Sequence, residues 1–362
     1  MTLPLRDELK GLKPYGAPQL DVPIKLNTNE NPFSPPADLI SAIAADISQI
    51  AGELNRYPDR DAIELRTQLA QYLNEESQVS LDANQVWAAN GSNEIMLQLL
   101  QAYGGPNRKA LTFTPTYSMY EEYARDTNTE FIAIDRLKDF SVNEDLVTTS
   151  LKEHSPSVVF FASPNNPTGT AMDLSIIQNV APNFPSTIFV VDEAYAEFRR
   201  PGVASALTLL PALPNLVVTR TMSKAFAFAG VRLGYLAASE ALINDLMLVR
   251  LPYHLSSVTQ SVAKTALRFA AELQADLDVI RRERDDLLVW LGENGFTAAE
   301  SDANFVLFGT FTDRHAAWQA LVDHGILIRE VGPTGWLRVT IGTPTEMQSF
   351  KTALLRVKAE MS

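Results

Sequence analysis

The 362-residue sequence predicts an α/β protein, in which a large domain with a mostly parallel sheet between helices precedes a smaller α+β domain. Two observations support this prediction. Short apolar runs alternate with segments of helical periodicity through most of the chain, which is the pattern of βαβ units. After about residue 255 the pattern changes to one long amphipathic segment, followed by mixed strands and helices.

Short apolar segments predict the strands of the large sheet. Several are apolar at nearly every position, as expected for strands that are buried on both faces of a parallel sheet. Helical periodicity between them predicts covering helices, one beginning after Gly91 and one with Asp173 as its N-cap. The predicted strands are 86–89, 109–113, 130–134, 158–162, 187–191 and 216–219, and further predicted helices are 42–50, 62–73, 118–127 and 173–180.

The last third of the sequence predicts a separate module. The amphipathic stretch 262–291 ends in a charged block, and shorter elements follow it. We expect strands at 304–308, 326–329 and 337–341, and helices at 315–324 and 344–358. The predicted division is an N-terminal segment (1–35) associated with the small domain and the active-site entrance, a large domain (36–255) and a small C-terminal domain (256–362).

The composition excludes several classes of site. The chain has no cysteine, which rules out disulfides, thiolate nucleophiles, cysteine-ligated zinc and iron–sulfur clusters. Its four histidines show no metal-binding spacing, so we expect no metal site. The net charge of −13 argues against nucleic acid as a partner, because phosphate neutralisation requires clustered basic residues. A local anion site built from a few arginines is compatible with this charge.

No segment resembles a membrane span or a secretion signal. The longest apolar runs have strand length, far short of the roughly 18 apolar residues that a transmembrane helix requires. The N-terminal segment carries early acidic residues and no apolar run, unlike a signal peptide. We therefore expect a cytoplasmic protein that does not enter a membrane.

Lys224 is the strongest candidate for a reactive residue. It follows a predicted strand and lies among small hydroxyl and apolar residues, where its amine can be desolvated. Burial disfavours the ammonium form, lowers the pKa and makes the amine a nucleophile toward a carbonyl. Thr221, Ser223 and Arg232 lie nearby in the sequence and offer hydroxyls and a forked cation to a phosphate. The alternative is an ordinary strand-end lysine in a salt bridge.

Asp192 and Tyr195 follow another predicted strand, at the edge where open α/β sheets bind ligands. A buried carboxylate there needs a cationic partner, and a protonated pyridine nitrogen is one. Tyr195 would then reach the phenolate oxygen of the same ring, and the amide of Asn166 would donate to that oxygen. The alternatives are an N-cap aspartate with a packed tyrosine and, for Asn166, an ordinary turn at 163–169.

A helix start and one tyrosine complete the candidate site. Ser92 and Asn93 follow Gly91 at the start of a predicted helix, where free N–H groups and the helix dipole favour a phosphate. Simple N-capping is the alternative for this segment. Tyr117 is expected either to stack on an aromatic ring or to pack as a core residue.

The order of these motifs resembles the pyridoxal-phosphate (PLP) aminotransferases of the aspartate aminotransferase fold, which are fold type I PLP enzymes. The blocks that carry this resemblance are 90–94 (NGSNE), 165–169 (NNPTG), 192–195 (DEAY) and 223–224 (SK) with Arg232. The blocks that resemble the histidinol-phosphate aminotransferase family more narrowly are 26–32 (LNTNENP), 55–59 (NRYPD), 221–226 (TMSKAF), 328–330 (IRE) and 337–342 (LRVTIG). The resemblance extends from about Tyr15 to the C-terminus. It is less specific for substrate, because aromatic aminotransferases share most blocks.

The resemblance implies pyridoxal 5'-phosphate as the cofactor and a role for each candidate residue. Lys224 attaches the cofactor and Asp192 pairs with its pyridine nitrogen, while Tyr195 and Asn166 bond the ring oxygen, Asn166 also facing the substrate. The resemblance further implies that the cofactor phosphate binds to the amides of Ser92 and Asn93, to Thr221, Ser223 and Arg232, and, in a homodimer, to Tyr57 of the partner. Tyr117 would stack on the face of the ring. Arg329 and Arg338, with Tyr15 nearby, would bind the anionic end of the substrate. The family often has an acidic residue where this chain has Asn93, but a backbone donor does not depend on that side chain.

The resemblance implies reversible transamination between L-histidinol phosphate and 2-oxoglutarate, giving imidazole acetol phosphate and glutamate, in histidine biosynthesis. An aromatic amino acid (phenylalanine) aminotransferase with the same cofactor is the closest alternative. Another alternative is a PLP-dependent decarboxylase of the threonine-phosphate type, which shares the fold. A cofactor-binding regulator is a further alternative, but such a regulator would need a DNA-binding module, and the chain has no spare segment for one. The motifs GxxxxGK[ST], GxGxxG, HExxH and GxSxG are absent.

Overall fold

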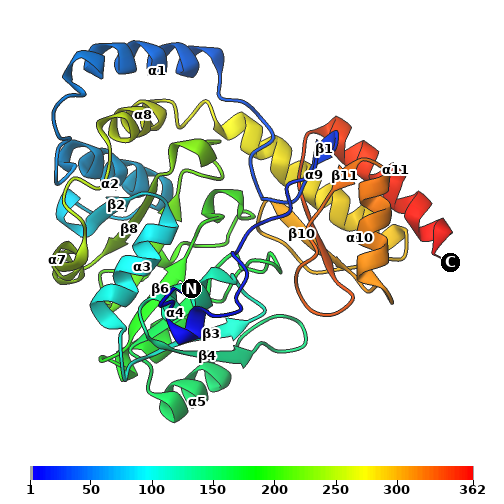
Figure 1. Cartoon of the computed structure of the whole chain (residues 1–362), viewed down its shortest axis with the longest axis horizontal. Helices are drawn as coiled ribbons and strands as arrows, with labels where there is room; N and C mark the ends of the chain where they lie inside the picture. The colour runs from blue at the N-terminus through cyan, green and yellow to red at the C-terminus, as the bar shows by residue number, and fades with distance from the viewer. Residues whose placement is uncertain (1–2, 362) are drawn as a thin grey trace.

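A seven-stranded sheet forms the centre of the larger part of the molecule (Figure 1). The computed structural model describes residues 3–361, and its strand order is β2-β8-β7-β6-β5-β3-β4. The strands are β2 (Val86–Ala89), β3 (Lys109–Thr114), β4 (Glu130–Asp135), β5 (Val158–Ala162), β6 (Ile188–Asp192), β7 (Leu216–Thr221) and β8 (Gly234–Ala238). β8 is antiparallel to both of its neighbours, whereas the other neighbouring strands are parallel.

Helices cover both faces of this sheet. They are α1 (Ala37–Ile50), α2 (Ile63–Ser77), α3 (Ser92–Tyr103), α4 (Met119–Asp126), α5 (Glu144–His154), α6 (Ser175–Val180), α7 (Glu240–Val249) and α8 (Ser257–Arg268). Val158 and Phe160 of β5 belong to the apolar cluster that includes α3, α4 and α7. Val159 and Phe161 alternate with them and belong to the cluster that includes α2, α5, α6 and α8. The strand is apolar throughout because both of its faces are buried.

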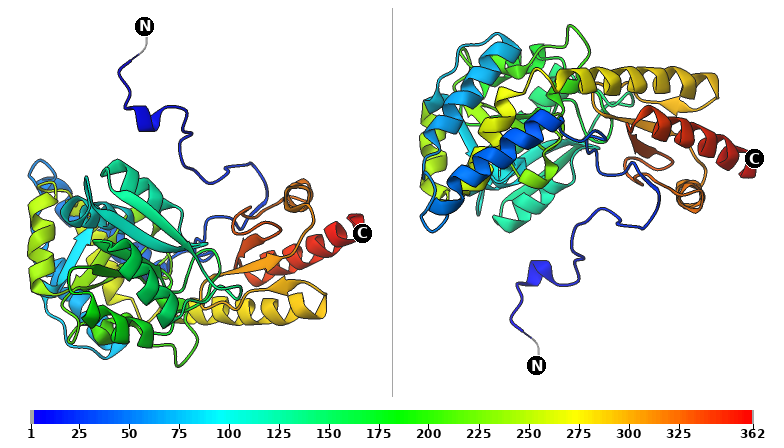
Figure 2. Two further views of the ribbon diagram at one scale, coloured as in Figure 1. Left: turned by 90° about the horizontal axis from the view of Figure 1, so that it is seen from below. Right: turned by 90° about the horizontal axis from the view of Figure 1, so that it is seen from above.

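The C-terminal part of the chain, as described up to residue 361, forms a three-stranded sheet with three helices. β10 (Phe305–Gly309) lies between β9 (Thr297–Ala298) and β12 (Leu337–Thr340) in an antiparallel sheet. Its helices are α9 (Gln274–Glu293), α10 (Arg314–Asp323) and α11 (Pro344–Glu360). Figure 2 shows α9 and α11 running side by side, away from the large sheet.

The N-terminal segment connects the two parts. β1 (Ile24–Lys25) pairs in parallel with β11 (Ile326–Leu327), so residues close to the start of the chain join the C-terminal part. Shortly after β1, the Asn29 amide N–H donates to Thr340 and the Asn31 side chain donates to the Ala225 carbonyl of the large part. The segment after β1 therefore lies where the two parts meet. Before β1, the described chain has little regular structure (Figure 2), and Tyr15 and Ala17 of this segment line the cavity described below.

The predicted fold class is confirmed, and the elements differ from the prediction in three respects. The single amphipathic stretch predicted at 262–291 is two helices, α8 and α9. The predicted N-cap is wrong by one position, because α6 begins at Ser175 after Leu174, although the Asp173 carboxylate accepts from the Ser175 amide at 2.9 Å. The elements β1, β8, β9, α5 and α7 were not predicted.

The division into three parts stays a prediction. Helix packing is relevant to the predicted boundary between the large and the small domain, at residues 255–256. α8, which follows that boundary, packs against α1 and α2 of the large part, whereas α9 contacts β9 and β10 of the C-terminal part. Within residues 3–361, no helix has both the length and the apolar character needed to cross a membrane.

Candidate active site

A cavity of about 260 Å³ opens at the carboxyl ends of β5, β6 and β7, where parallel sheets commonly bind ligands. The N-terminal segment, the start of α3 and β12 also contribute to its wall. All predicted site residues except Tyr57 line this cavity: Tyr15, Ser92, Asn93, Tyr117, Asn166, Asp192, Tyr195, Thr221, Ser223, Lys224, Arg232, Arg329 and Arg338. In the described part of the chain, no group of three or more His, Asp or Glu side chains could hold a metal ion.

Asp192 presents a buried carboxylate at the end of β6. Tyr120 donates to its Oδ2 at 2.8 Å and Thr219 donates to its Oδ1 at 3.1 Å. Burial raises the pKa of Asp192, and these two hydrogen bonds oppose that rise. No ion pair within residues 3–361 includes Asp192. A cation at this carboxylate would therefore be stabilised, and the protonated pyridine nitrogen of PLP meets that requirement.

Lys224 follows β7 and faces the same cavity. Its Nζ donates to the Thr28 carbonyl at 3.1 Å and lies 6.0 Å from the centre of the Tyr195 ring. Burial lowers the pKa of Lys224 to about 8, and the nearby Arg338 adds to this effect. About a tenth of the amine would be uncharged at pH 7, a far larger share than for a lysine in water. The residue has the chemistry required of a nucleophilic amine.

The Tyr195 hydroxyl lies where two side-chain amides converge. Asn29 Nδ2 donates to it at 3.0 Å and Asn166 Nδ2 donates to it at 3.5 Å. Asn29 is itself held by Thr340, which donates to its Oδ1 at 2.9 Å. The donors predicted for the cofactor's ring oxygen are thus assembled on one side of the cavity.

Two glycines allow β8 and the Arg232 side chain to approach the start of α3 closely. A Cβ on Gly234 would lie 2.2 Å from the Ser92 amide nitrogen, and a Cβ on Gly91 would lie 2.8 Å from Arg232 Nη2. The first amides of a helix have no partner within the helix, so they are free to bind an anion. Thr221 and Ser223 lie at the same wall, 3.0 Å apart between their hydroxyl oxygens. These features fit the phosphate of PLP.

The wall of the cavity also includes two cations, Arg329 and Arg338. They form an isolated antiparallel bridge, and neither makes an ion pair with a carboxylate within residues 3–361. Arg338 donates to Asn166 Oδ1 at 2.5 Å and to the Asn27 carbonyl at 2.8 Å. Arg338 Nε and Arg329 Nη1 are buried without a hydrogen-bond partner. Because burying unpaired cationic donors is unfavourable, this wall fits an anionic group of a substrate.

Replacing Arg338 with lysine is expected to raise the KM for an anionic substrate by about 10- to 100-fold, since charged hydrogen bonds contribute roughly 1.5–3 kcal/mol each and lysine cannot reproduce the fork. We expect kcat to change little, and steady-state kinetics would separate the two effects. Arg314→Lys is the matched control, because Arg314 pairs with Glu330 and does not line the cavity. An unchanged KM in Arg338→Lys would contradict the assignment.

The tyrosines differ in their placement. Tyr117 lines the cavity and donates to Asn93 Oδ1 at 3.4 Å, while Tyr15 lines the cavity with half of its surface exposed. Tyr57 lies away from the cavity: it is 80% exposed and stacks on Tyr253, with 4.5 Å between the ring centres. Within one chain, the structure therefore does not bring Tyr57 to the other site residues.

Three residues of this site were not predicted. Asn29 belongs to the block 26–32 (LNTNENP), which resembles the histidinol-phosphate aminotransferase family. The asparagines of this block, close to apolar Leu26, were the signal in the sequence that could have identified Asn29 as a site residue. Tyr120 and Thr219 donate hydrogen bonds to the Asp192 carboxylate. Tyr120 was not predicted because, in the sequence, it cannot be distinguished from any other aromatic residue of a helix. The partner of a buried carboxylate depends on tertiary packing, which the local sequence does not specify.

Comparisons with known proteins agree with this geometry. The aminotransferase class I and II family matches residues 21–354. The histidinol-phosphate aminotransferase of Thermobifida fusca is 59% identical over 98% of this chain and 95% of its own length. That of Frankia casuarinae is 55% identical over 98% of this chain and 90% of its own length. A solved Sinorhizobium meliloti histidinol-phosphate aminotransferase, in complex with pyridoxal-5'-phosphate, has the same fold, with a TM-score of 0.83, 22% identity and coverage of 94% of this chain and 92% of that one.

The match over nearly the whole chain, together with a cavity whose residues fit PLP, defines a class: this is a PLP-dependent aminotransferase of class I and II. The relatives define a narrower family, because more than half of their aligned residues are identical to those of this chain, over at least nine-tenths of their length. The chain belongs to the histidinol-phosphate aminotransferase family.

Proposed function

We propose that the chain catalyses reversible transamination between L-histidinol phosphate and 2-oxoglutarate, giving imidazole acetol phosphate and glutamate, as a step of histidine biosynthesis. The observation that carries this proposal is a pair of cations, Arg329 and Arg338, which line the same cavity as the proposed phosphate contacts and have no carboxylate partner within residues 3–361. Histidinol phosphate presents a phosphate ester and glutamate presents a carboxylate, so one pair of guanidinium groups suits both substrates. The names of the relatives favour this substrate.

The bound cofactor supplies an electron sink for the charge that develops when the substrate carbon loses its proton. Lys224 Nζ is placed to remove that proton, and its lowered pKa suits an amine that must act as base and then as acid. Asp192 is placed to hold a proton on the ring nitrogen through a charge-assisted contact. Asn166 and Tyr195, which are hydrogen-bonded to each other, would bond the ring oxygen of the cofactor. Arg329 and Arg338 would hold the anionic group of the substrate and so limit its orientation.

We further propose that the active unit is a homodimer in which Tyr57 reaches the cofactor phosphate of the partner. Its support is the exposure of apolar side chains at and near the stack of Tyr57 on Tyr253. Tyr57 is 80% exposed, and Leu251, which precedes Tyr253 closely in the sequence, is 71% exposed; exposed apolar side chains of this kind favour association with a second copy. A symmetric dimer would use the same surface twice. The cytoplasmic location stays a prediction.

Mixing two variants tests the contribution in trans. Tyr57→Phe removes only the hydroxyl, and we expect its affinity for PLP to fall about tenfold, as for loss of one charged hydrogen bond. At limiting PLP, Tyr57→Phe and Lys224→Ala are each expected to be nearly inactive. After the variants are mixed and subunits exchange, hybrid dimers contain one intact site, so activity is expected to recover to about a quarter of wild type.

The arrangement of the hybrids makes the mixing result decisive. If Tyr57 acted within its own chain, every hybrid site would lack either Tyr57 or Lys224, and no recovery would occur. Tyr253→Phe is the control, because it removes the hydroxyl of the neighbouring stacked ring. Its PLP affinity is expected to stay at the wild-type value.

The substrate is tested by the visible absorption of the bound cofactor after adding one amino donor without a keto acid. We expect rapid conversion at low histidinol phosphate and slow conversion with phenylalanine. Faster conversion with phenylalanine would assign the chain to the aromatic aminotransferases instead. Release of carbon dioxide without formation of glutamate from 2-oxoglutarate would indicate a decarboxylase.

A further inference from the structure

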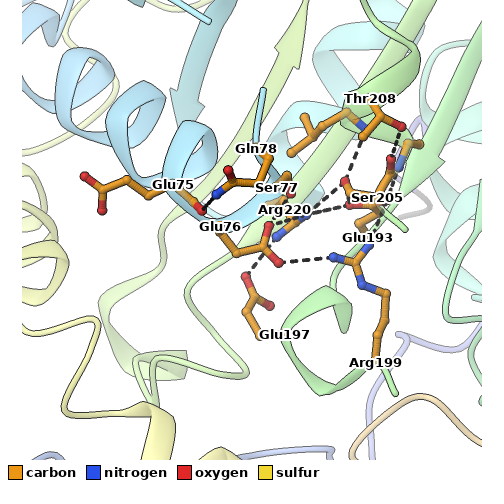
Figure 3. Close-up of polar contacts among 12 residues, drawn as sticks. Glu75, Glu76, Ser77, Gln78, Glu193, Glu197, Arg199, Ser205, Thr208 and Arg220 are labelled. Carbon is orange, nitrogen blue, oxygen red and sulfur yellow. Dashed lines mark hydrogen bonds and ion pairs between the residues drawn. The ribbon is translucent and has the colours of Figure 1, made fainter. Parts of the chain in front are cut away.

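A buried cluster of charged residues lies beside the cofactor-facing ends of β6 and β7 (Figure 3). Arg220 is at its centre and is only 1% exposed. Its Nε donates to Glu193 Oε2 at 2.9 Å, its Nη1 to Glu197 Oε1 at 3.3 Å and its Nη2 to Glu76 Oε2 at 3.2 Å. We refer to these four residues, with Arg199 and Ser205, as the Arg220 cluster.

Arg199 and Ser205 complete the cluster. Arg199 donates to Glu76 at 3.1 Å and to Glu193 at 3.5 Å, so it joins two of the carboxylates that also bind Arg220. Ser205 Oγ donates to Glu193 at 2.7 Å and accepts from Arg220 at 3.1 Å. Figure 3 shows the two guanidinium groups among the carboxylates. Because an unpaired buried charge is costly, each member restrains the position of the others.

Strand geometry connects the Arg220 cluster to the cofactor cavity. Successive side chains of a strand point to opposite faces of the sheet. In β7, Thr219 bonds to Asp192 and Thr221 lines the cavity, while Arg220 between them points into the cluster. Asp192 lines the cavity at the end of β6, and the next residue, Glu193, joins the cluster. The cluster therefore holds the same two backbone segments that present residues to the cofactor.

We propose that Arg220 is a positioning residue for the cofactor: through Glu193 it fixes the backbone that presents Asp192 to the ring nitrogen, and through its own strand it fixes Thr221 at the phosphate wall. Loss of its forked contacts would let the ends of β6 and β7 shift relative to each other. Reacting groups must be held within a fraction of an ångström, so a small shift affects catalysis. This inference rests on the cofactor site, and not on the identity of the amino donor.

Arg220→Lys tests the proposal, because lysine keeps the charge but cannot hold several carboxylates with one planar fork. The expected result is a rise of about tenfold in the dissociation constant for PLP, measured by titrating the cofactor-free chain without substrate. In the loaded enzyme, kcat is expected to fall while the KM for the amino donor stays within about twofold. The pH dependence of the cofactor's visible absorption is also expected to shift, since the pairing at Asp192 is altered.

Arg284 supplies a matched control. It is equally buried, but it donates to the Phe198 carbonyl and to Asp285 and makes no contact with a carboxylate of the Arg220 cluster. Arg284→Lys is expected to lower Tm while leaving the PLP dissociation constant unchanged. Wild-type PLP affinity and an unchanged absorption profile in Arg220→Lys, with only a lower Tm, would overturn the proposal.

A milder variant keeps the proposal falsifiable if Arg220→Lys does not fold. Ser205→Ala removes the hydrogen bonds of the Ser205 hydroxyl with Glu193, Arg220 and the Leu207 amide, and it leaves every charge in place. We expect a smaller rise of the PLP dissociation constant, in the same direction. Since these measurements use PLP alone, their outcome is independent of whether histidinol phosphate proves to be the amino donor.

Discussion

Replacing Lys224 with alanine is expected to lower kcat for amino transfer by about 10⁴-fold, the largest effect of any single substitution in this chain. Lys224 lines the cavity with Asp192 and Tyr195, and we propose that it is both the attachment point of the cofactor and the proton-transfer group, roles that a lowered pKa suits. Glutamate formation in a coupled assay would measure the loss. The visible absorption of the bound cofactor would report whether PLP still enters the site.

The pH dependence of cofactor capture tests the same lysine before any substrate is present. Lys224 has a pKa lowered to about 8, and only its uncharged amine attacks a carbonyl. The rate at which the cofactor-free chain captures PLP is therefore expected to rise as pH increases through 7, to reach half of its plateau near pH 8 and to level off above about pH 9. Lys264→Ala removes a surface lysine paired with Glu64 and is expected to leave this profile unchanged. A rate that still rises at pH 10 would show that Lys224 titrates like a lysine in water.

The central strands were predictable because their physical signal is local. β5 is apolar at every position and is bounded by polar residues, so its prediction matches the structure at both ends. β8 was missed because its five small and apolar residues (GYLAA) directly follow Arg232 and Leu233 in the segment that carries the candidate phosphate contacts, without a separate turn signal. β1 is two residues long, and its pairing with β11 spans almost the whole chain. No local pattern in the sequence specifies such a contact.

The candidate site was predictable where a motif follows a strand, because parallel strands deliver their C-terminal residues to one edge. Asp192 and Lys224 were therefore expected near each other, and both line the same cavity. Tyr120 and Arg220 were not predicted, because each is buried beside the site and belongs to no motif. The role of Tyr57 was assigned through resemblance alone, because a contact between subunits leaves no signal in the local sequence.

Asparagine in place of Asp192 is expected to lower kcat by about 10²- to 10³-fold, the size of effect seen when one preorganised electrostatic contact is removed from a reacting centre. The amide has nearly the same shape as the carboxylate but cannot hold a proton on the ring nitrogen through an opposite charge. PLP should still bind, because its phosphate contacts and Lys224 remain, and the KM for each substrate should change little. Single-turnover kinetics with a pre-loaded enzyme would isolate this loss in the proton-transfer step.

Tyr120→Phe provides a graded test of the same contact. The Tyr120 hydroxyl lowers the pKa of Asp192 against the effect of burial, so its removal is expected to raise that pKa further. The carboxylate would then be protonated at higher pH, and the acidic limb of the kcat/KM profile would move to higher pH, with a loss in rate of about tenfold at neutral pH. Tyr235→Phe is the matched control, because Tyr235 is fully buried and its hydroxyl has no hydrogen-bond partner. If the acidic limb moved equally in both variants, the shift would reflect general loosening of the core and not the hydrogen bond to Asp192.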